Sequence, residues 1–146
     1  MKIDFFINER FKEPEIRICN HELTEELVGL KNTISKLVNK MLAGYRDGEV
    51  EMLPCDRIYR IYSLNQRTIA ETEDESFVLH DTLRELEEAL FENQFVRISK
   101  SELVNLRKVK KLDTKLAGTI KVFMQNGSET FVSRRNVTKI KQMLGM

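Results

Sequence analysis

The sequence after Gly48 is divided into many short apolar runs separated by polar turns, and this rhythm constrains the fold more than any other feature. Alternation of apolar and polar residues over such short runs is typical of strands that are buried on one face. The Asn126-Gly127 pair lies between two of the runs and strongly predicts a tight hairpin. Strands are expected at residues 50–53, 57–62, 68–71, 77–80, 95–98, 103–106, 108–112, 118–124 and 129–133.

Two short helices interrupt or follow this β pattern. Thr82 is a predicted N-cap, and Glu85 completes a capping box, in which each side chain bonds the other residue's backbone N–H. Leu83, Leu86 and Leu90 would form the inner face of this helix. A last helix is expected at about residues 136–144. The predicted class is therefore α+β, mainly antiparallel β with few short helices.

The first 47 residues follow a different pattern, which predicts a small β-β-α segment. Residues 2–7 and 15–19 each have the composition of a short strand. Residues 24–41 have helical spacing, with Thr24 as the expected N-cap. The turn at residues 46–48 (Arg-Asp-Gly) is the best boundary candidate, so we expect an N-terminal segment at 1–47 and a β-rich domain at 48–146.

The predicted N-terminal helix carries an apolar stripe that has two interpretations. Spacings of three and four residues are typical of a coiled-coil seam, which favours a dimer. Other apolar residues widen the stripe, which favours a helix that packs on its own chain. Both interpretations remain open. The stripe consists of Leu23, Leu27, Leu30, Ile34, Leu37 and Met41, and it is widened by Val28, Val38 and Leu42.

The net charge of +1 conceals an asymmetry between two parts of the chain. Residues 97–146 contain twelve Lys and Arg but only three acids, a net charge of +9, whereas residues 1–96 carry −8. Such a basic segment predicts a surface that faces a polyanion. The competing interpretation is that these charges only solvate separate faces of the protein.

The sequence contains no pattern typical of catalysis, of metal binding or of a bound cofactor. His21 and His80 have no metal-ligand spacing, and the glycines are too dispersed to form a phosphate loop. We therefore expect a protein that is not an enzyme and has no cofactor. Cys19 and Cys55 are isolated and are expected to be reduced. The first residues lack the features of a signal peptide, and no apolar run is long enough for a membrane span, so we expect a cytoplasmic protein.

The run FVRISKSELVNLRKVKKL, which starts at residue 95, interrupts its alternation with Ser-Lys-Ser. With the later NG and FVSRRNV, it resembles the core of the LytTR DNA-binding domain of bacterial transcription regulators. In that family a strand of the form aromatic-x-Arg leads to a [His/Ser]-[Lys/Asn]-Ser turn and then to Val-Asn. Upstream, LPCDRIYRI and TLRELEEAL match the same domain in order and spacing. The resemblance covers about residues 48–146.

The resemblance implies an elongated β domain that binds duplex DNA sequence-specifically, through loops between its strands, and so regulates transcription. The contacts carried over by position form three groups: Asn65, Gln66 and Arg67; Ser99, Lys100 and Ser101; and Arg134 and Arg135. For Arg134 an ion pair within the protein is an equal alternative. Asn105 is expected to bond backbone and not DNA. Ser99 and Gln66 depart from residues common in the family, which leaves the preferred DNA sequence undetermined.

The resemblance also implies partners. Members of the family commonly occupy paired sites, so we expect a homodimer. The first residues resemble the N-terminal segment of stand-alone LytTR regulators, which are often encoded beside a small membrane protein thought to restrain them. Too few residues precede residue 48 for a receiver domain, so phosphorelay control is not expected. The alternative function is a protein-interaction or RNA-binding module on the same basic face. Phe123 and Phe131 are expected in the core, which argues against RNA, because single-stranded RNA is usually stacked on exposed aromatic rings.

Overall fold

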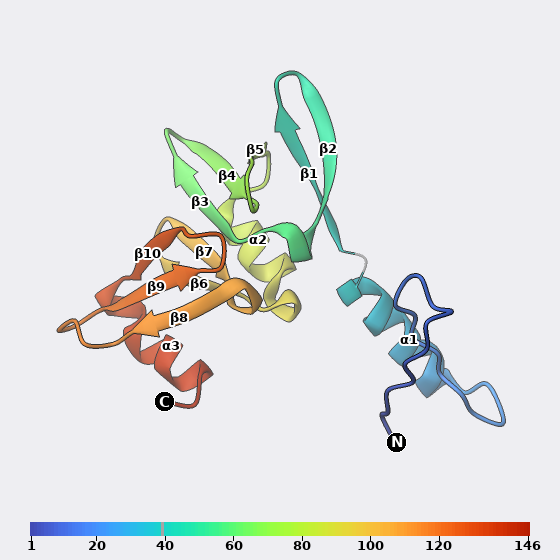
Figure 1. Ribbon diagram of the computed structural model, residues 1–146. Coiled ribbons are helices and arrows are strands. Elements are labelled where there is room, and N and C mark those ends of the chain that lie inside the picture. The colour runs from blue at the N-terminus through green and yellow to red at the C-terminus, as the bar shows by residue number, and fades with distance from the viewer. Residues whose placement is uncertain (39) are drawn as a thin grey trace. The chain divides into compact units, whose positions relative to one another are not determined.

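The computed structural model describes residues 1–38 and 40–146 (Figure 1). Its contacts divide the chain into two compact units, Met1–Lys36 and Leu37–Met146. All ten strands of the described residues belong to the second unit, and the mainly antiparallel fold expected from the sequence is confirmed.

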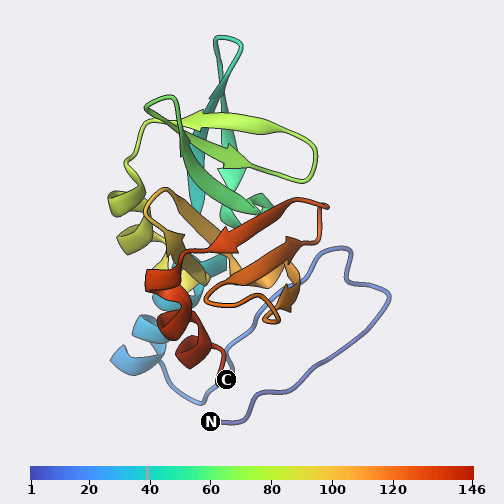
Figure 2. The same ribbon diagram turned by 90° about the vertical axis from the view of Figure 1, so that its left-hand side faces the viewer.

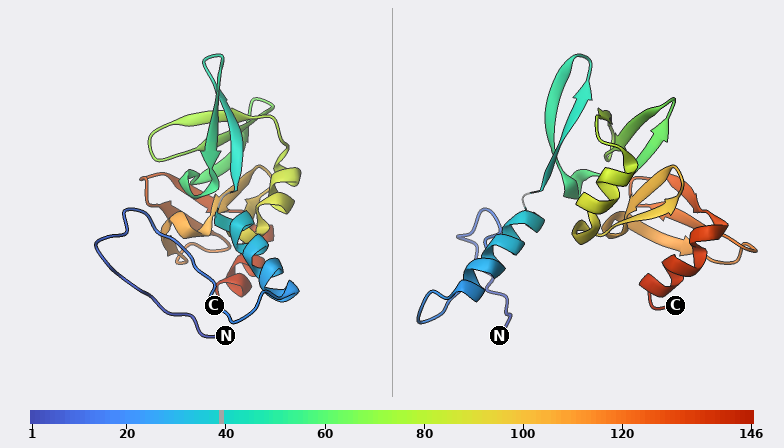
Figure 3. Two further views of the ribbon diagram at one scale, coloured as in Figure 1. Left: turned by 90° about the vertical axis from the view of Figure 1, so that its right-hand side faces the viewer. Right: turned by 180° about the vertical axis from the view of Figure 1, so that it is seen from behind.

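The larger of two sheets, sheet A, has seven strands in the order β2-β1-β5-β4-β3-β7-β6. Every neighbouring pair in it is antiparallel. The hairpin β1–β2 projects beyond the rest of the sheet (Figure 3) and joins it through a single register pair, Tyr45 with Val78. The strands are β1 (Met41–Arg46), β2 (Glu49–Pro54), β3 (Arg60–Leu64), β4 (Arg67–Glu71), β5 (Ser76–Leu79), β6 (Phe95–Ser99) and β7 (Glu102–Asn105).

Sheet B has three antiparallel strands, β8 (Val109–Asp113), β9 (Ile120–Met124) and β10 (Glu129–Val132), with β9 in the centre. The predicted Asn126-Gly127 turn joins β9 to β10, and Gly127 has the positive φ of 89° that favours glycine. Helix α3 (Val137–Met143) follows β10 through the short 3₁₀ helix η4 (Arg134–Asn136), and it lies beside sheet B (Figure 2).

Strands β6 and β7 lie between two apolar cores, which explains why their sequence is apolar on both faces. Phe95 and Leu103 pack in the first core, with α2 (Leu83–Ala89) and the middle strands of sheet A. Val96, Ile98 and Val104 pack in the second core, with sheet B and α3. Thr82 is the N-cap of α2 as predicted, because its Oγ1 accepts a bond from Glu85 N. The carboxylate of Glu85 bonds the hydroxyl of Thr82, at 3.1 Å, in place of the backbone N–H that a capping box requires.

A charged cluster connects sheet A to sheet B. The guanidinium of Arg60 bonds both carboxylate oxygens of Glu71, at 3.0 and 3.2 Å, and one oxygen of Glu102 at 3.0 Å. The other oxygen of Glu102 accepts a 2.7 Å bond from Thr130 on β10. Glu71 also accepts a 2.7 Å bond from Ser128, which precedes β10. Glu71 is therefore a structural residue that links the two sheets.

This cluster shifts the pKa values of its two acids in opposite directions. Burial alone would raise the pKa of Glu71, but hydrogen bonds from Arg60, Ser128 and Asn126 lower it below its usual value. Burial raises the pKa of Glu102, and the bonds from Thr130 and Arg60 offset only part of that effect.

The first unit differs from its prediction. Residues 2–7 and 15–19 form no strand, because neither is paired with another extended segment. Helix α1 begins at Glu25 with Thr24 as its cap, since Thr24 Oγ1 accepts a bond from Leu27 N. It ends at Val38, earlier than the expected Met41. The predicted β-β-α segment is therefore a helix preceded by an irregular chain.

The expected boundary at residues 46–48 lies within a hairpin. Met41, expected at the end of a helix, begins β1, and Asp47-Gly48 is the turn between β1 and β2. Gly44 lies in β1 at a position where a side chain would not fit. A Cβ at this position would lie 2.6 Å from Leu53 Cδ1.

Within residues 1–38 and 40–146, no helix is long and apolar enough to cross a membrane. The same residues contain no group of three or more His, Cys, Asp or Glu side chains that could hold a metal ion.

Candidate nucleic-acid interface

The three segments expected to contact DNA are neighbours at one end of sheet A. Strands β3 and β7 pair with Tyr62 opposite Glu102, so the turn after β3 lies beside the turn before β7. Ser63 N donates a 2.9 Å bond to Ser101 O at this point. On the other side of the same turn, Ser133 N donates a 2.8 Å bond to Ile98 O. The 99–101 turn is therefore held between the β3–β4 turn and the start of η4.

The β3–β4 turn holds its two central residues in the left-handed region. Asn65 has φ 50° and Gln66 has φ 62°, as a two-residue hairpin of type I′ requires. Asn tolerates this conformation, but Gln adopts it at a cost of about 1 kcal/mol or more. Both side chains are exposed, as is that of Arg67, which follows them.

Arg67 also lines an open hollow of about 360 Å³ beside the β1–β2 hairpin. The hollow is lined in addition by Tyr45, Arg46 and Phe77. Arg46 is occupied by an ion pair with Glu75 at 2.9 Å. In the described part of the chain Arg67 has no ion pair, so its charge is available to a ligand.

The 99–101 turn is organised by its own side chains and by Arg97. Ser101 N donates a 3.2 Å bond to Ser99 Oγ, which closes the turn. Arg97 Nε donates a 2.8 Å bond to Ser99 O, and its Nη2 donates to Lys100 O. Ser99 is therefore partly engaged within the protein. Lys100 and Ser101 are exposed, and Lys100 makes no ion pair among the described residues.

Arg134 and Arg135 lie in η4, which is separated from the end of β10 by Ser133. Both are exposed. The alternative of an ion pair for Arg134 has no support in the described ranges, where neither arginine makes one. The side chain of Arg134 lies against Gly118, where a Cβ would be 3.4 Å from its Nε.

The role expected for Asn105 is confirmed. Its Nδ2 donates a 3.0 Å bond to Ile58 O, and its Oδ1 accepts a bond from Arg107 N. The side chain is 1% exposed, so it joins two segments of backbone and faces no ligand.

Sequence reasoning missed Glu87, on α2, which links two parts of this end of the domain. Glu87 Oε2 accepts a 3.1 Å bond from Arg97 Nη1, and Oε1 lies 3.8 Å from Lys139 Nζ on α3. The strand pattern with an Arg two residues after an aromatic residue was the only signal of this arrangement. The sequence did not show that the side chain of Arg97 bonds the carbonyl oxygens of the 99–101 turn and the carboxylate of Glu87 on α2.

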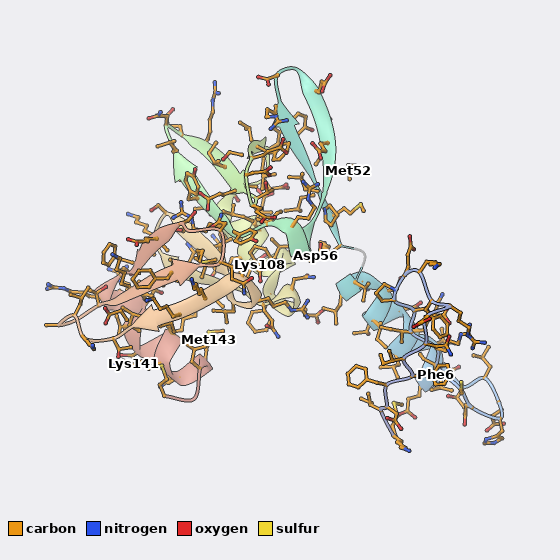
Figure 4. The ribbon with its side chains drawn as sticks, viewed as in Figure 1. Phe6, Met52, Asp56, Lys108, Lys141 and Met143 are labelled. Atoms are coloured by element: carbon orange, nitrogen blue, oxygen red, sulfur yellow. The ribbon has the colours of Figure 1, made fainter. Side chains whose placement is uncertain are left out.

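The prediction that Phe123 and Phe131 lie in the core is wrong. Val122, Met124 and Val132 face the core, so the alternating positions on β9 and β10 face outward. Phe131 is 49% exposed and Phe123 is half-buried. The ammonium of Lys111 lies 4.7 Å from the centre of the Phe123 ring, and that of Lys121 lies 5.0 Å from it. Elsewhere in the domain Lys108 (labelled in Figure 4) covers the ring of Tyr59 in the same manner, at 5.2 Å.

Comparison with known proteins gives one consistent result. A family model described as the LytTr DNA-binding domain matches residues 48–145. Two uncharacterized HTH-type transcriptional regulators of Staphylococcus aureus, from strains MSSA476 and NCTC 8325, are each 31% identical over 147 residues. These alignments cover 100% of this chain and 99% of each relative. A solved LytTr DNA-binding domain, from a Bacillus cereus protein described as a methyl-accepting/DNA response regulator, has 19% identity and a TM-score of 0.71. That match covers 74% of this chain and 99% of the solved chain. The chain therefore belongs to the LytTR family.

Proposed function

We propose that this protein is a transcriptional regulator that binds duplex DNA sequence-specifically and reads it with the loops at one end of sheet A. The observation that carries the proposal is the convergence of three exposed segments, 65–67, 99–101 and 134–135, joined by the bonds from Ser63 to Ser101 and from Ser133 to Ile98. Membership of a family whose model is described as DNA-binding, and relatives described as transcriptional regulators, support the same conclusion.

The chemistry of the three segments suits a duplex. Lys100, Arg134 and Arg135 have no acidic partner in the described chain, so they can neutralise phosphates without breaking an ion pair. Arg is also the side chain that most often reads guanine, and Gln reads adenine, through paired hydrogen bonds in the major groove. Because the two turns are fixed by strands on both sides, and η4 by β10 and α3, these segments lose little entropy when they dock.

Selection of bound sequences from a random duplex pool is the direct test. The proposal expects one enriched motif, and binding that weakens with salt at a slope of about −0.9 per phosphate contact. Lys100→Ala and Arg135→Ala should each weaken binding to the selected site by about 1–3 kcal/mol if they read bases. Lys110→Ala, which removes a cation from β8, is the matched control and should have a smaller effect. A pool without enrichment, together with affinity that does not change with salt, would refute the proposal.

We also infer that the first unit mediates a homodimer. No residue of α1 is buried, and its apolar stripe (Leu27, Leu30, Ile34 and Leu37) is only half-buried. Several apolar residues before α1 are largely exposed, including Ile3 and Phe5, each 90% exposed. A unit of this size without a buried residue lacks the apolar core that makes a small domain stable on its own. A second copy of the chain, paired along α1, would supply that burial.

Sedimentation of the wild type and of a Leu30→Glu/Leu37→Glu variant tests the dimer. We expect a wild-type dimer at tens of micromolar and a folded, monomeric variant. A variant that unfolds would show that the stripe is part of the protein's own core. A folded wild type that stays monomeric would contradict the dimer. The small membrane protein implied by the family resemblance would then be the next partner to test for the apolar stripe of α1.

The outer face of sheet B supports a second candidate function, the binding of single-stranded nucleic acid. Phe131 and Phe123 are accessible from solvent, with Lys111 and Lys121 beside them, and bases stack on such rings. Against it, Glu129 pairs with Lys121 at 2.7 Å on the same face. Phe131→Ala should weaken binding of a single-stranded oligonucleotide and leave duplex binding unchanged. If this variant and the wild type bound the single-stranded oligonucleotide equally well, this second candidate function would be excluded.

A further inference from the structure

The guanidinium of Arg97 makes three hydrogen bonds, and all of them are within the protein. Two of its nitrogens donate to the carbonyl oxygens of Ser99 and Lys100, and the third bonds the carboxylate of Glu87. The side chain is 20% exposed, so its charge is partly shielded from solvent. Arg97 therefore fixes the backbone of the turn that presents Lys100, and it does not itself resemble a free phosphate ligand.

Glu87 is the residue that fixes Arg97. Its carboxylate lies between two cations from different elements, Arg97 on β6 and Lys139 on α3. Helix α3 directly follows η4, which carries Arg134 and Arg135. One acid on α2 is thus connected to two of the three segments of the interface.

We propose that Glu87 is a positioning residue for DNA binding, which holds the 99–101 turn through Arg97 and the η4–α3 segment through Lys139. The inference rests on the proposed function. When the carboxylate is removed, Arg97 loses its ion pair and is free to leave the carbonyls of Ser99 and Lys100. The turn then samples other conformations, and a loop that must be ordered on binding lowers affinity.

The direction of the change in DNA affinity distinguishes a positioning role of Glu87 from a purely electrostatic one. Removing an acid near a DNA-binding surface reduces repulsion, and it should strengthen binding to any duplex. A positioning role predicts the opposite on the specific site, because loss of Glu87 disturbs the arrangement that reads the sequence. Glu88, the next residue on α2, provides the matched control. It is exposed and makes no ion pair in the part of the chain that the structure describes.

The test compares Glu87→Ala with Glu88→Ala in the full chain, on the duplex selected by the wild type and on a random duplex. For Glu87→Ala we expect affinity for the selected site to fall about twofold to fivefold. Its affinity for the random duplex should be unchanged or higher, so that the ratio of specific to non-specific binding falls. Glu88→Ala should leave this ratio unchanged. Glu87→Gln, which keeps an oxygen that can accept from Arg97, should restore part of the loss. If Glu87→Ala binds the selected site as well as Glu88→Ala, or more tightly, the proposal is overturned.

A second measurement needs no DNA and therefore separates failure of this inference from failure of the proposed function. The amide of Ser101 is protected by its bond to Ser99 Oγ. Its hydrogen exchange should be faster in Glu87→Ala than in the wild type and unchanged in Glu88→Ala. Thermal unfolding of the three proteins reports whether the fold is retained, and Glu87→Gln replaces Glu87→Ala if the latter is unfolded at the assay temperature. Unchanged exchange at Ser101 in a folded variant would contradict the positioning role even if DNA binding were lost.

Discussion

Arg60→Met should be among the most destabilising single substitutions on the surface of sheet A. The methionine keeps much of the apolar stem but removes the only cation that contacts both Glu71 and Glu102 in the described residues. All three side chains are at most 18% exposed, so the two acids remain poorly solvated after the change. Removing one partner of a buried ion pair typically costs 3–5 kcal/mol, and the partial exposure here favours the lower end, about 3 kcal/mol at pH 7.

The loss should depend on pH. In the wild type, the pKa of Glu71 is lowered, so its contribution to stability is present at neutral pH and is lost as the pH falls through that lowered pKa. Glu102 has a raised pKa and acts in the opposite direction, since its protonation favours the folded state. Arg60 lowers the pKa of both acids, so both should have a higher pKa in the variant than in the wild type. The cost of the substitution should therefore shrink as the pH falls below 7.

Urea unfolding followed by near-UV circular dichroism measures this difference. The chain has three tyrosines, Tyr45, Tyr59 and Tyr62, and no tryptophan, so the tyrosine signal reports on the unit formed by residues 37–146. Arg57→Met is the matched control. Arg57 pairs with Glu51 at 3.3 Å, but both side chains are nearly half exposed, and the change should cost less than about 1 kcal/mol. The reasoning is refuted if Arg60→Met costs no more than Arg57→Met, or if its cost is the same at pH 5 and pH 7.

Three further substitutions or measurements follow from local geometry. Gly44→Ala should destabilise the domain by about 1–3 kcal/mol in urea, because the added Cβ would lie 2.6 Å from Leu53 Cδ1; an unchanged midpoint would show that β1 shifts freely. Gln66→Gly should raise the free energy of unfolding by about 1 kcal/mol, because glycine adopts φ 62° without strain, while affinity for the selected duplex falls. In a thiol-reagent assay at pH 8 Cys19 should react at once and Cys55 only on unfolding, because Cys55 is buried and burial raises its pKa to about 11; two fast thiols would contradict this.

Much of the second unit could be predicted because the sequence patterns that specify it involve residues close together in the chain. The Thr82 N-cap and the Asn126-Gly127 turn each depend on residues a few positions apart, and both form as expected. The bonds of Asn105 to backbone were expected from its place after an apolar pair in a strand. Signals of this kind require no knowledge of which strands pair.

The errors arose where tertiary partners decide the outcome. Alternation in β10 shows that Phe131 and Val132 face opposite sides, but it does not show which side is covered. The same limit applies to residues 2–7, which have strand composition but no pairing partner. The ion-pair cluster of Arg60 with Glu71 and Glu102 was not predicted, because β7 brings Glu102 beside Arg60 only in the folded sheet. The three loops were found by resemblance to a family, and only the pairing of β3 with β7 explains why two of them are neighbours.

The place of β3 in sheet A has a consequence for the order in which the chain folds. Its partner β4 follows after a two-residue turn, so this hairpin can form early, whereas its other partner β7 is about 40 residues farther along the chain. Closing so long a loop before its contacts form slows folding. Until β7 arrives, β3 is an open edge that exposes Ile61, an apolar residue fully buried in the finished domain. Chains that end before residue 102 should therefore aggregate through this edge. The ion pair between Glu102 and Arg60 can form only when β7 pairs with β3 and covers it.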